Sequence, residues 1–172
     1  QEKWRRTCER EHQRVGLRIE IRDNPGLSTI WAGQMDWEGY CQCADCRAID
    51  QREGSPAGSI ISFVNQLAAD VEKEFPNVTI STFAYQYSQP PPRSIRVRDN
   101  VIVWLCTTGC SFAHPLTHEK NRKFREHLDG WASVCRRIYI FDYTTNFAHY
   151  LCPHPNVRTL APNARYFAQH NV

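Results

Sequence analysis

The stretch VTISTFAY, residues 78–85, is rich in β-branched and aromatic residues and predicts a strand. It follows a predicted helix that Ser55 and Pro56 open, because serine suits the N-cap position and proline the first helical position. Pro76 and Asn77 end this helix. Its apolar stripe consists of Ile60, Ile61, Val64, Leu67, Ala68, Val71 and Phe75. The stretch and the helix before it predict one helix-to-strand unit of an α/β fold.

Helix and strand patterns also alternate before and after this unit. Apolar runs predict four strands, at about 28–35, 78–85, 101–106 and 137–142. A second helix carries Phe124, Leu128, Trp131 and Cys135 on one face, and a short helix is expected over residues 163–170. Strands joined mostly by helices predict a parallel sheet. We therefore expect one α/β domain over residues 1–172.

Composition excludes several classes of protein. The chain has 172 residues, of which 41% are hydrophobic and 23% charged, and this is ordinary globular composition. Its net charge of +3 is too small to indicate a nucleic-acid partner. No apolar run approaches the roughly 20 residues that a membrane helix needs. We expect neither nucleic acid nor membrane as a partner.

Polar and aromatic residues stand where the predicted strands end, and ligands of parallel α/β sheets bind at the carboxyl ends of the strands. Asp36 and Asp142 are the candidate catalytic carboxylates, because both stand at predicted strand ends beside an aromatic residue. Structural carboxylates are nevertheless commoner than catalytic ones, so each Asp has a competing structural interpretation. The candidate substrate-binding residues are Gln34, Trp37, Tyr85, Tyr87, His114, Tyr143 and Asn146.

Three cysteines, Cys41, Cys43 and Cys46, have the spacing C-x-C-x-x-C, which favours two interpretations equally. They could bind zinc, the one candidate cofactor, with Cys106 or Cys110 as the fourth ligand and Cys110 as the preferred one. Alternatively, Cys43 or Cys46 could form a disulfide with Cys110.

Several long blocks resemble a known family. They include QMDWEGYCQCADCRAIDQREGSPAGSIISFVNQLA from residue 34, FAYQYSQPPP from residue 83 and YIFDYTTNFAHYLCPHPNV from residue 139. From about residue 24 onward, these blocks are similar to a mostly bacterial domain family of unknown function. That family occurs in glycosidase-like proteins and is thought to form a TIM-type barrel akin to α-glucuronidases and β-hexosaminidases.

The resemblance implies a partial (β/α)8 barrel with parallel strands and outer helices, because a whole barrel has eight strands. The chain would be the middle portion of a longer barrel, completed by the remaining chain or by self-association. It would be a carbohydrate-active domain resembling glycoside hydrolases of acidic or N-acetylated sugars, with Asp142 the favoured acid. The alternatives are a non-catalytic carbohydrate-binding or scaffold module and a zinc-stabilised interaction domain. We expect the parent protein to be secreted or periplasmic.

Overall fold

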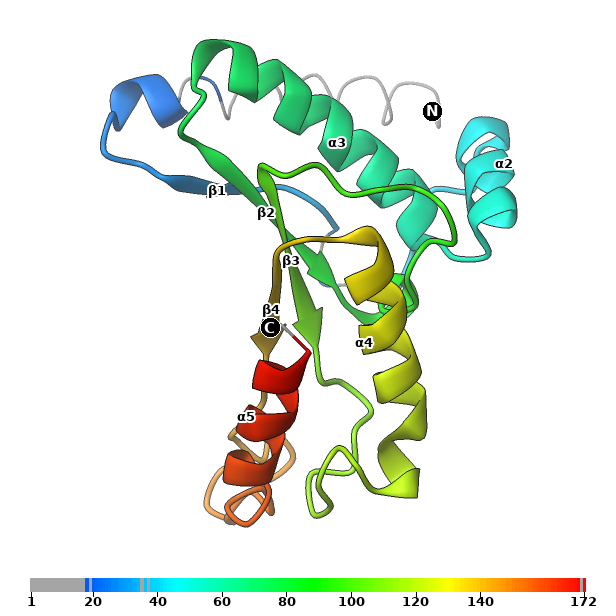
Figure 1. The fold of residues 1–172 in the computed structure, drawn as a ribbon, viewed down its shortest axis with the longest axis vertical. Helices are drawn as coiled ribbons and strands as arrows, with labels where there is room; N and C mark the ends of the chain where they lie inside the picture. The colour runs from blue at the N-terminus through cyan, green and yellow to red at the C-terminus, as the bar shows by residue number, and fades with distance from the viewer. Residues whose placement is uncertain (1–17, 19, 35, 37, 171) are drawn as a thin grey trace.

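The computed structural model describes residues 18, 20–34, 36, 38–170 and 172, and its centre is a four-stranded sheet. The strands are β1 (Thr29–Trp31), β2 (Thr79–Ala84), β3 (Val101–Cys106) and β4 (Ile138–Phe141). All neighbouring pairs are parallel, and the spatial order β1-β2-β3-β4 is the order along the chain. The predicted α/β class and its parallel sheet are confirmed (Figure 1).

Helices α3 (Ala57–Glu74) and α4 (Arg122–Val134) pack on one face of this sheet, and α2 (Ala44–Glu53) packs against α3. Helix α5 (Leu160–Gln169) follows β4, and the 3-10 turns are η1 (Gln86–Ser88) and η2 (Glu119–Asn121). Alternate strand residues such as Ile80, Val103 and Leu105 join the apolar sides of α3 and α4 in one core. In the described part of the chain, no helix has the length and apolar character needed to cross a bilayer.

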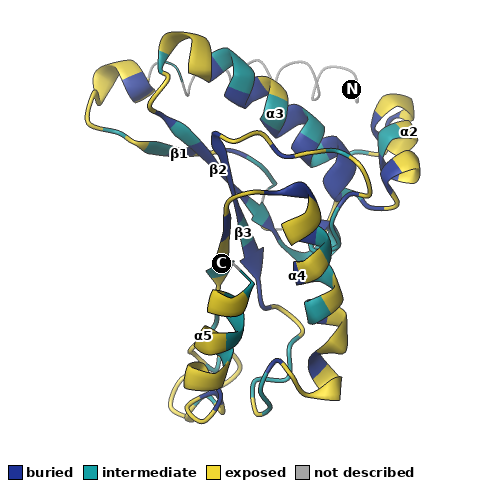
Figure 2. Ribbon diagram, in the orientation of Figure 1, coloured by how far each residue is buried: buried dark blue, intermediate teal, exposed yellow. Residues whose placement is uncertain are grey.

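The opposite face of the sheet carries aromatic residues that are partly exposed: Trp31 by 48%, Tyr139 by 45% and Phe141 by 40%. Figure 2 shows the central strand β3 as mostly buried and the edge strand β1 as less so. The aromatic rings form a connected set, with Trp31 and Phe83 centroids 4.7 Å apart and Trp104 and Tyr139 centroids 5.0 Å apart. Phe141 continues the set, 5.4 Å from Phe83. Both faces of a parallel sheet are normally covered, so this face is unusual in being left accessible.

Helix α2 begins inside the cysteine motif, and the sequence analysis did not predict this helix. Cys43 is the N-cap residue, and its sulfur accepts a hydrogen bond from the Cys46 amide at 3.2 Å. Gly54 ends the helix in the left-handed conformation, with φ of 70°. The expectation missed the helix because cysteine is not among the residues that usually cap one.

A buried carboxylate fixes the end of α2 against the loop between β2 and β3. Glu53 is 2% exposed, and its Oε2 accepts hydrogen bonds from the amides of Ser94 (2.7 Å) and Ile95 (3.0 Å). The Arg52 side chain and the Ser94 hydroxyl donate to Oε1, each at 3.0 Å. Burial raises the pKa of Glu53, but these hydrogen bonds outweigh it and lower the pKa to about 2.

We expect Glu53→Gln to lower the free energy of unfolding by about 2 kcal/mol at pH 7, because it weakens several charge-assisted hydrogen bonds in a buried position. Urea denaturation measures this loss. Because the folded-state pKa is depressed, the stabilisation is complete above the unfolded-state pKa of about 4.3 and is lost as the pH falls towards 2. The variant should therefore lose less stability than the wild type over that range.

Glu119→Gln is the matched control. The Glu119 side chain is 75% exposed and pairs only at the surface, so its loss should cost under about 0.5 kcal/mol. Equal unfolding midpoints for wild type and Glu53→Gln would contradict the anchoring role of Glu53.

Candidate functional site

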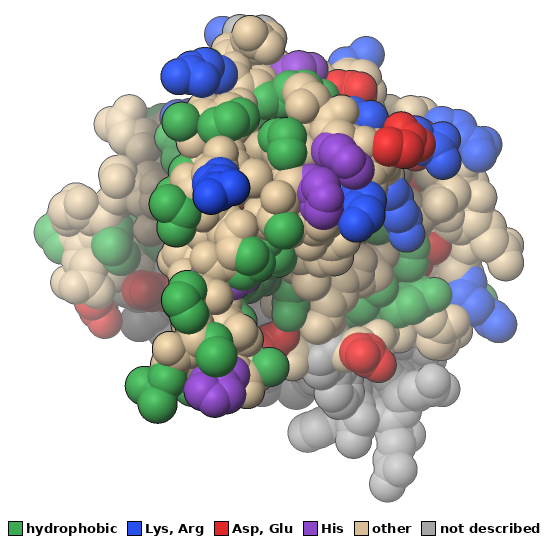
Figure 3. All heavy atoms as spheres, turned by 90° about the horizontal axis from the view of Figure 1, so that it is seen from below, with side chains coloured by type: hydrophobic (Ala, Val, Ile, Leu, Met, Phe, Trp, Pro, Cys, Tyr) green, Lys and Arg blue, Asp and Glu red, His purple; other side chains and the backbone are tan. Residues whose placement is uncertain are grey.

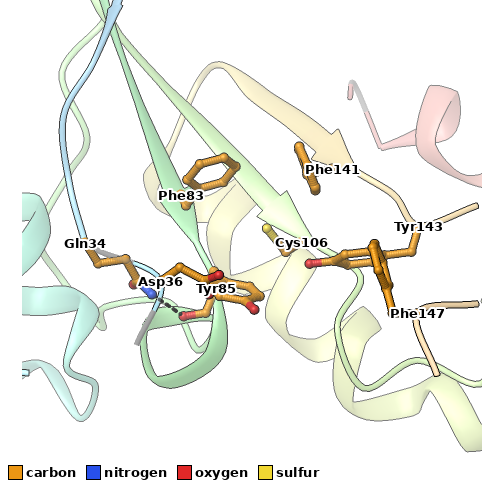
Figure 4. A pocket seen from close by; sticks show the side chains of 8 residues that line it. All are labelled: Gln34, Asp36, Phe83, Tyr85, Cys106, Phe141, Tyr143 and Phe147. Atoms are coloured by element: carbon orange, nitrogen blue, oxygen red, sulfur yellow. Dashed lines mark hydrogen bonds between the residues drawn. The ribbon is translucent and has the colours of Figure 1, made fainter. Parts of the chain in front are cut away.

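A pocket of about 510 Å³ lies at the carboxyl ends of the four strands. This volume falls within the range of small-molecule sites. Figure 4 shows Cys106 in the middle of the pocket, between residues that belong to or follow β1 and β2 on one side and residues that belong to or follow β4 on the other. The pocket is lined by Gln34, Asp36, Phe83, Tyr85, Cys106, Phe141, Tyr143 and Phe147.

Asp36 and Tyr85 form the polar side of the pocket. Burial raises the pKa of Tyr85, and the Asp36 carboxylate raises it further through its charge and a hydrogen bond from the phenol. The Tyr85 hydroxyl is therefore protonated at neutral pH. The pair offers a ligand both a carboxylate acceptor and a neutral hydroxyl.

Cys106 and Tyr143 form the floor and the opposite wall. Burial raises the pKa of the Cys106 thiol to about 12, against the opposing effect of a hydrogen bond with Tyr143. Burial also raises the pKa of Tyr143. Cys106 is thus a neutral thiol, and its environment is the reverse of the electropositive one that activates a nucleophilic cysteine.

Gln34 is held by the protein itself. Its Nε2 donates to the Tyr85 carbonyl at 3.1 Å, and its Oε1 accepts a short hydrogen bond from the Ser88 hydroxyl. Since both ends of the amide are engaged, Gln34 positions Tyr85 rather than offering a free amide to a ligand.

The structure brings together four of the predicted site residues and separates the others. Gln34, Asp36, Tyr85 and Tyr143 line the pocket, and Trp37 lies outside the described residues. The remaining predicted substrate-binding residues are not among those that line it.

Those residues have local partners instead. The Tyr87 ring packs against Tyr40 in a tilted arrangement, with centroids 5.0 Å apart. The Asn146 Oδ1 accepts from two backbone amides of its own turn. The His114 Nδ1 lies 2.8 Å from the Ser111 hydroxyl. Each of these contacts organises a loop.

Asp142 also does not line the pocket. Its Oδ1 accepts hydrogen bonds from the Thr107 hydroxyl at 2.6 Å and from the Tyr143 amide at 2.9 Å. Phe141 and Tyr143, on either side of it, both line the pocket. Because successive side chains of an extended chain point to opposite faces, the Asp142 side chain points away from the face that Phe141 and Tyr143 share. Of the two candidate catalytic carboxylates, only Asp36 is among the residues that line this pocket.

The same alternation identifies residues that the sequence analysis missed. Phe83 and Phe141 each stand two positions before a predicted site tyrosine and share its face. Counting back by two from Tyr85 and Tyr143 would have found them. Cys106, which the sequence analysis considered only as an alternative metal ligand, also lines the pocket. Nothing in the sequence indicated that Phe147 would line it.

The sulfur atoms of Cys41, Cys43 and Cys46 all lie within 4.8 Å of one another. Burial, and hydrogen bonds with the Cys43 and Cys41 thiols, raise the pKa of Cys46 to about 12. Three thiols in this arrangement are compatible with a metal ion such as zinc.

Cys110 is not part of this group, contrary to the expected four-cysteine set. It lies in the loop after β3, where burial and then the charge of Asp142 raise its pKa to about 12. None of the seven cysteines that the structure describes forms a disulfide, so the alternative prediction of a disulfide from Cys43 or Cys46 to Cys110 is wrong for this structure.

Comparison with known proteins gives one result. A family model described as Domain of unknown function (DUF4838) matches residues 13–172. This confirms the expectation of a domain family of unknown function. No match was found among curated proteins or among solved structures.

The thiols should react at very different rates with a maleimide at pH 8. Among the described thiols, Cys152 is exposed and should be labelled first, whereas Cys106 and Cys110, each with a pKa of about 12, should react at least roughly a hundredfold more slowly. Timed labelling followed by peptide mass spectrometry measures the rate at each cysteine separately. Rapid labelling of Cys106 would contradict its description as a buried neutral thiol.

Proposed function

The chain belongs to the DUF4838 family of domains of unknown function, and we propose that the pocket at the ends of its strands binds carbohydrate. The observation that carries the proposal is the composition of the pocket wall. Aromatic rings of Phe83, Phe141 and Tyr143 share one cavity with the carboxylate of Asp36 and the hydroxyl of Tyr85.

This combination of groups matches the apolar face and the polar edge of a sugar ring. A pyranose presents C–H groups on its face, which pack on aromatic rings, and hydroxyls around its edge. The Asp36 carboxylate accepts hydrogen bonds from such hydroxyls. The Tyr85 phenol donates its own hydrogen bond to Asp36, so its oxygen is a further acceptor for a sugar hydroxyl. An apolar pocket with a few convergent polar groups is the usual form of a small-ligand site.

The pocket favours binding over hydrolysis by this chain. Glycoside hydrolases canonically use a pair of carboxyl groups flanking the scissile bond. Asp36 is the only carboxylate among the described residues that line the pocket, because Asp142 is engaged elsewhere. A hydrolase built on this domain would need its second carboxyl group from beyond these residues.

Charge favours an N-acetylated sugar over an acidic one. The lining residues in the described part of the chain include Asp36 and no lysine or arginine. An ionised Asp36 would repel a uronate, whereas it would accept a hydrogen bond from an acetamido N–H group. The ligand class proposed is therefore a neutral N-acetylated sugar.

We propose further that the sheet is part of a (β/α)8 barrel of the glycosidase-like kind. Its strands are parallel and sequential, its helices lie on one face, and its other face is aromatic. Such a barrel has its strands facing a common axis and its ligand site at their carboxyl ends. Further strands, from a longer chain or from a second copy, would cover the aromatic face.

Calorimetric titration with the N-acetylglucosamine disaccharide tests the binding function. We expect weak binding that Phe141→Ala and Asp36→Asn each reduce about fivefold to tenfold, because one removes a stacking surface and the other an ionic acceptor. A disaccharide that contains a uronate should bind more weakly than the N-acetylated one.

Tyr139→Ala is the control for Phe141→Ala. Tyr139 lies on the same strand and the same open face, but it is outside the pocket lining. Its substitution should leave the affinity unchanged. The proposal fails if the disaccharide does not bind or if Tyr139→Ala is as harmful as Phe141→Ala.

A second candidate function rests on the thiol cluster, for which we propose a structural zinc ion held by Cys41, Cys43 and Cys46. Zinc–sulfur bonds of about 2.3 Å in a tetrahedron place sulfurs roughly 3.8 Å apart, and the observed cluster is compatible with that spacing. The Cys46 amide donates to the Cys43 sulfur, which would stabilise it as a thiolate. Bound zinc would join the start of α2 to the segment that carries Asp36.

The purified protein should bind about one equivalent of zinc, measured by elemental analysis, with sulfur neighbours near 2.3 Å by X-ray absorption. The affinity of the protein for zinc should rise with pH, since the thiols must lose their protons to bind the metal. Cys43→Ser should abolish binding and Cys152→Ser should not. Zinc that remains bound in Cys43→Ser would refute this site.

A further inference from the structure

The loop between β4 and α5, residues 144–157, starts at the pocket and exposes apolar side chains. Phe147 lines the pocket and is nevertheless 63% exposed. Tyr150 is 73% exposed and Leu151 is 92% exposed. We call residues 144–157 the rim loop.

Aromatic rings lead from the pocket wall out along this loop. The Tyr143 and Phe147 centroids are 6.0 Å apart, and those of Phe147 and Tyr150 are 6.2 Å apart. Both pairs meet edge to face, at 81°. The aromatic surface of the pocket is therefore continuous with an exposed surface outside it.

The rim loop is held in place by its own hydrogen bonds. The Asn156 side chain donates to the Tyr143 carbonyl at 3.0 Å, and the Asn146 Oδ1 caps the turn before His149 at 3.1 Å. The Thr159 hydroxyl, just beyond the loop, donates to the Phe112 carbonyl at 3.1 Å. These bonds hold the backbone that carries the exposed rings, which lowers the entropic cost of binding a ligand there.

The loop carries aromatic, hydroxyl and amide groups without formal charge. Residues 144–157 contain no Lys, Arg, Asp or Glu, whereas residues 118–126 contain six such side chains, Glu119, Lys120, Arg122, Lys123, Arg125 and Glu126. Figure 3 views the molecule from the end at which this loop lies, with hydrophobic side chains spread over one side and most, though not all, of the basic ones on the other. An uncharged aromatic surface suits a neutral sugar and lacks the cations that a phosphate backbone requires.

We propose that the rim loop is an extension of the sugar site, which binds further units of a neutral oligosaccharide whose end unit occupies the pocket. The inference rests on the proposed carbohydrate-binding function and adds that the ligand is a chain of sugars rather than a single unit. Phe147 links the two parts, and Tyr150 is the outer stacking residue.

The test compares the N-acetylglucosamine disaccharide with the hexasaccharide in calorimetric titrations of the full chain. We expect the hexasaccharide to bind about fivefold to tenfold more tightly. Tyr150→Ala should remove this gain and leave the disaccharide affinity unchanged. Val157→Ala is the matched control, because Val157 is also exposed in the rim loop but makes no aromatic contact with the pocket. Both substitutions are at the surface, so folding should be preserved.

The outcomes separate this inference from the proposed function. Disaccharide binding that depends on Phe141, with no gain for the hexasaccharide, overturns the extension and leaves the pocket intact. A gain that survives Tyr150→Ala also overturns it. Failure of both sugars to bind overturns both proposals. Self-association that Tyr150→Ala abolishes, without any chain-length effect, assigns the surface to a second copy and also overturns the extension.

Discussion

Right-handed crossover connections are the constraint on which the rest of this structure depends. When parallel strands follow one another in chain order, a fixed crossover hand places every connection on the same face of the sheet. The core therefore forms between that face and α3 and α4, and the aromatic residues of the other face stay accessible. The same constraint brings all four carboxyl ends to one edge, where the pocket lies. Both the open face and the site follow from the connectivity.

The connection from β2 to β3 has no α-helix among its described residues, and the buried Glu53 carboxylate compensates for this. It binds the amides of Ser94 and Ile95, so a proline-rich loop is fixed without a helix of its own. Asp50 makes a similar bond to the Ser59 amide at 2.8 Å, which joins α2 to α3. Since α2 starts within the thiol cluster, these two carboxylates also connect the cluster to the sheet.

The pocket holds a buried cysteine whose environment does not activate it as a nucleophile. Its tyrosines and its cysteine all have raised pKa values and remain protonated at neutral pH. Its single described carboxylate, Asp36, accepts hydrogen bonds. Neutral hydroxyls, one carboxylate and aromatic faces suit a ligand with hydroxyls around an apolar ring. The aromatic surface continues along the rim loop to Tyr150.

The sequence by itself determined the α/β class, the four strands and the strand ends at which the site lies, because apolar runs and helical stripes depend on local periodicity. It also placed Asp36, Tyr85 and Tyr143 at the site. Only the tertiary structure decided that Asp142 turns away, that Cys110 is separate from the thiol cluster and that Phe147 joins the pocket. Those outcomes depend on which face a side chain takes and on how loops from different strands pack, and both are set by contacts between residues far apart in the chain.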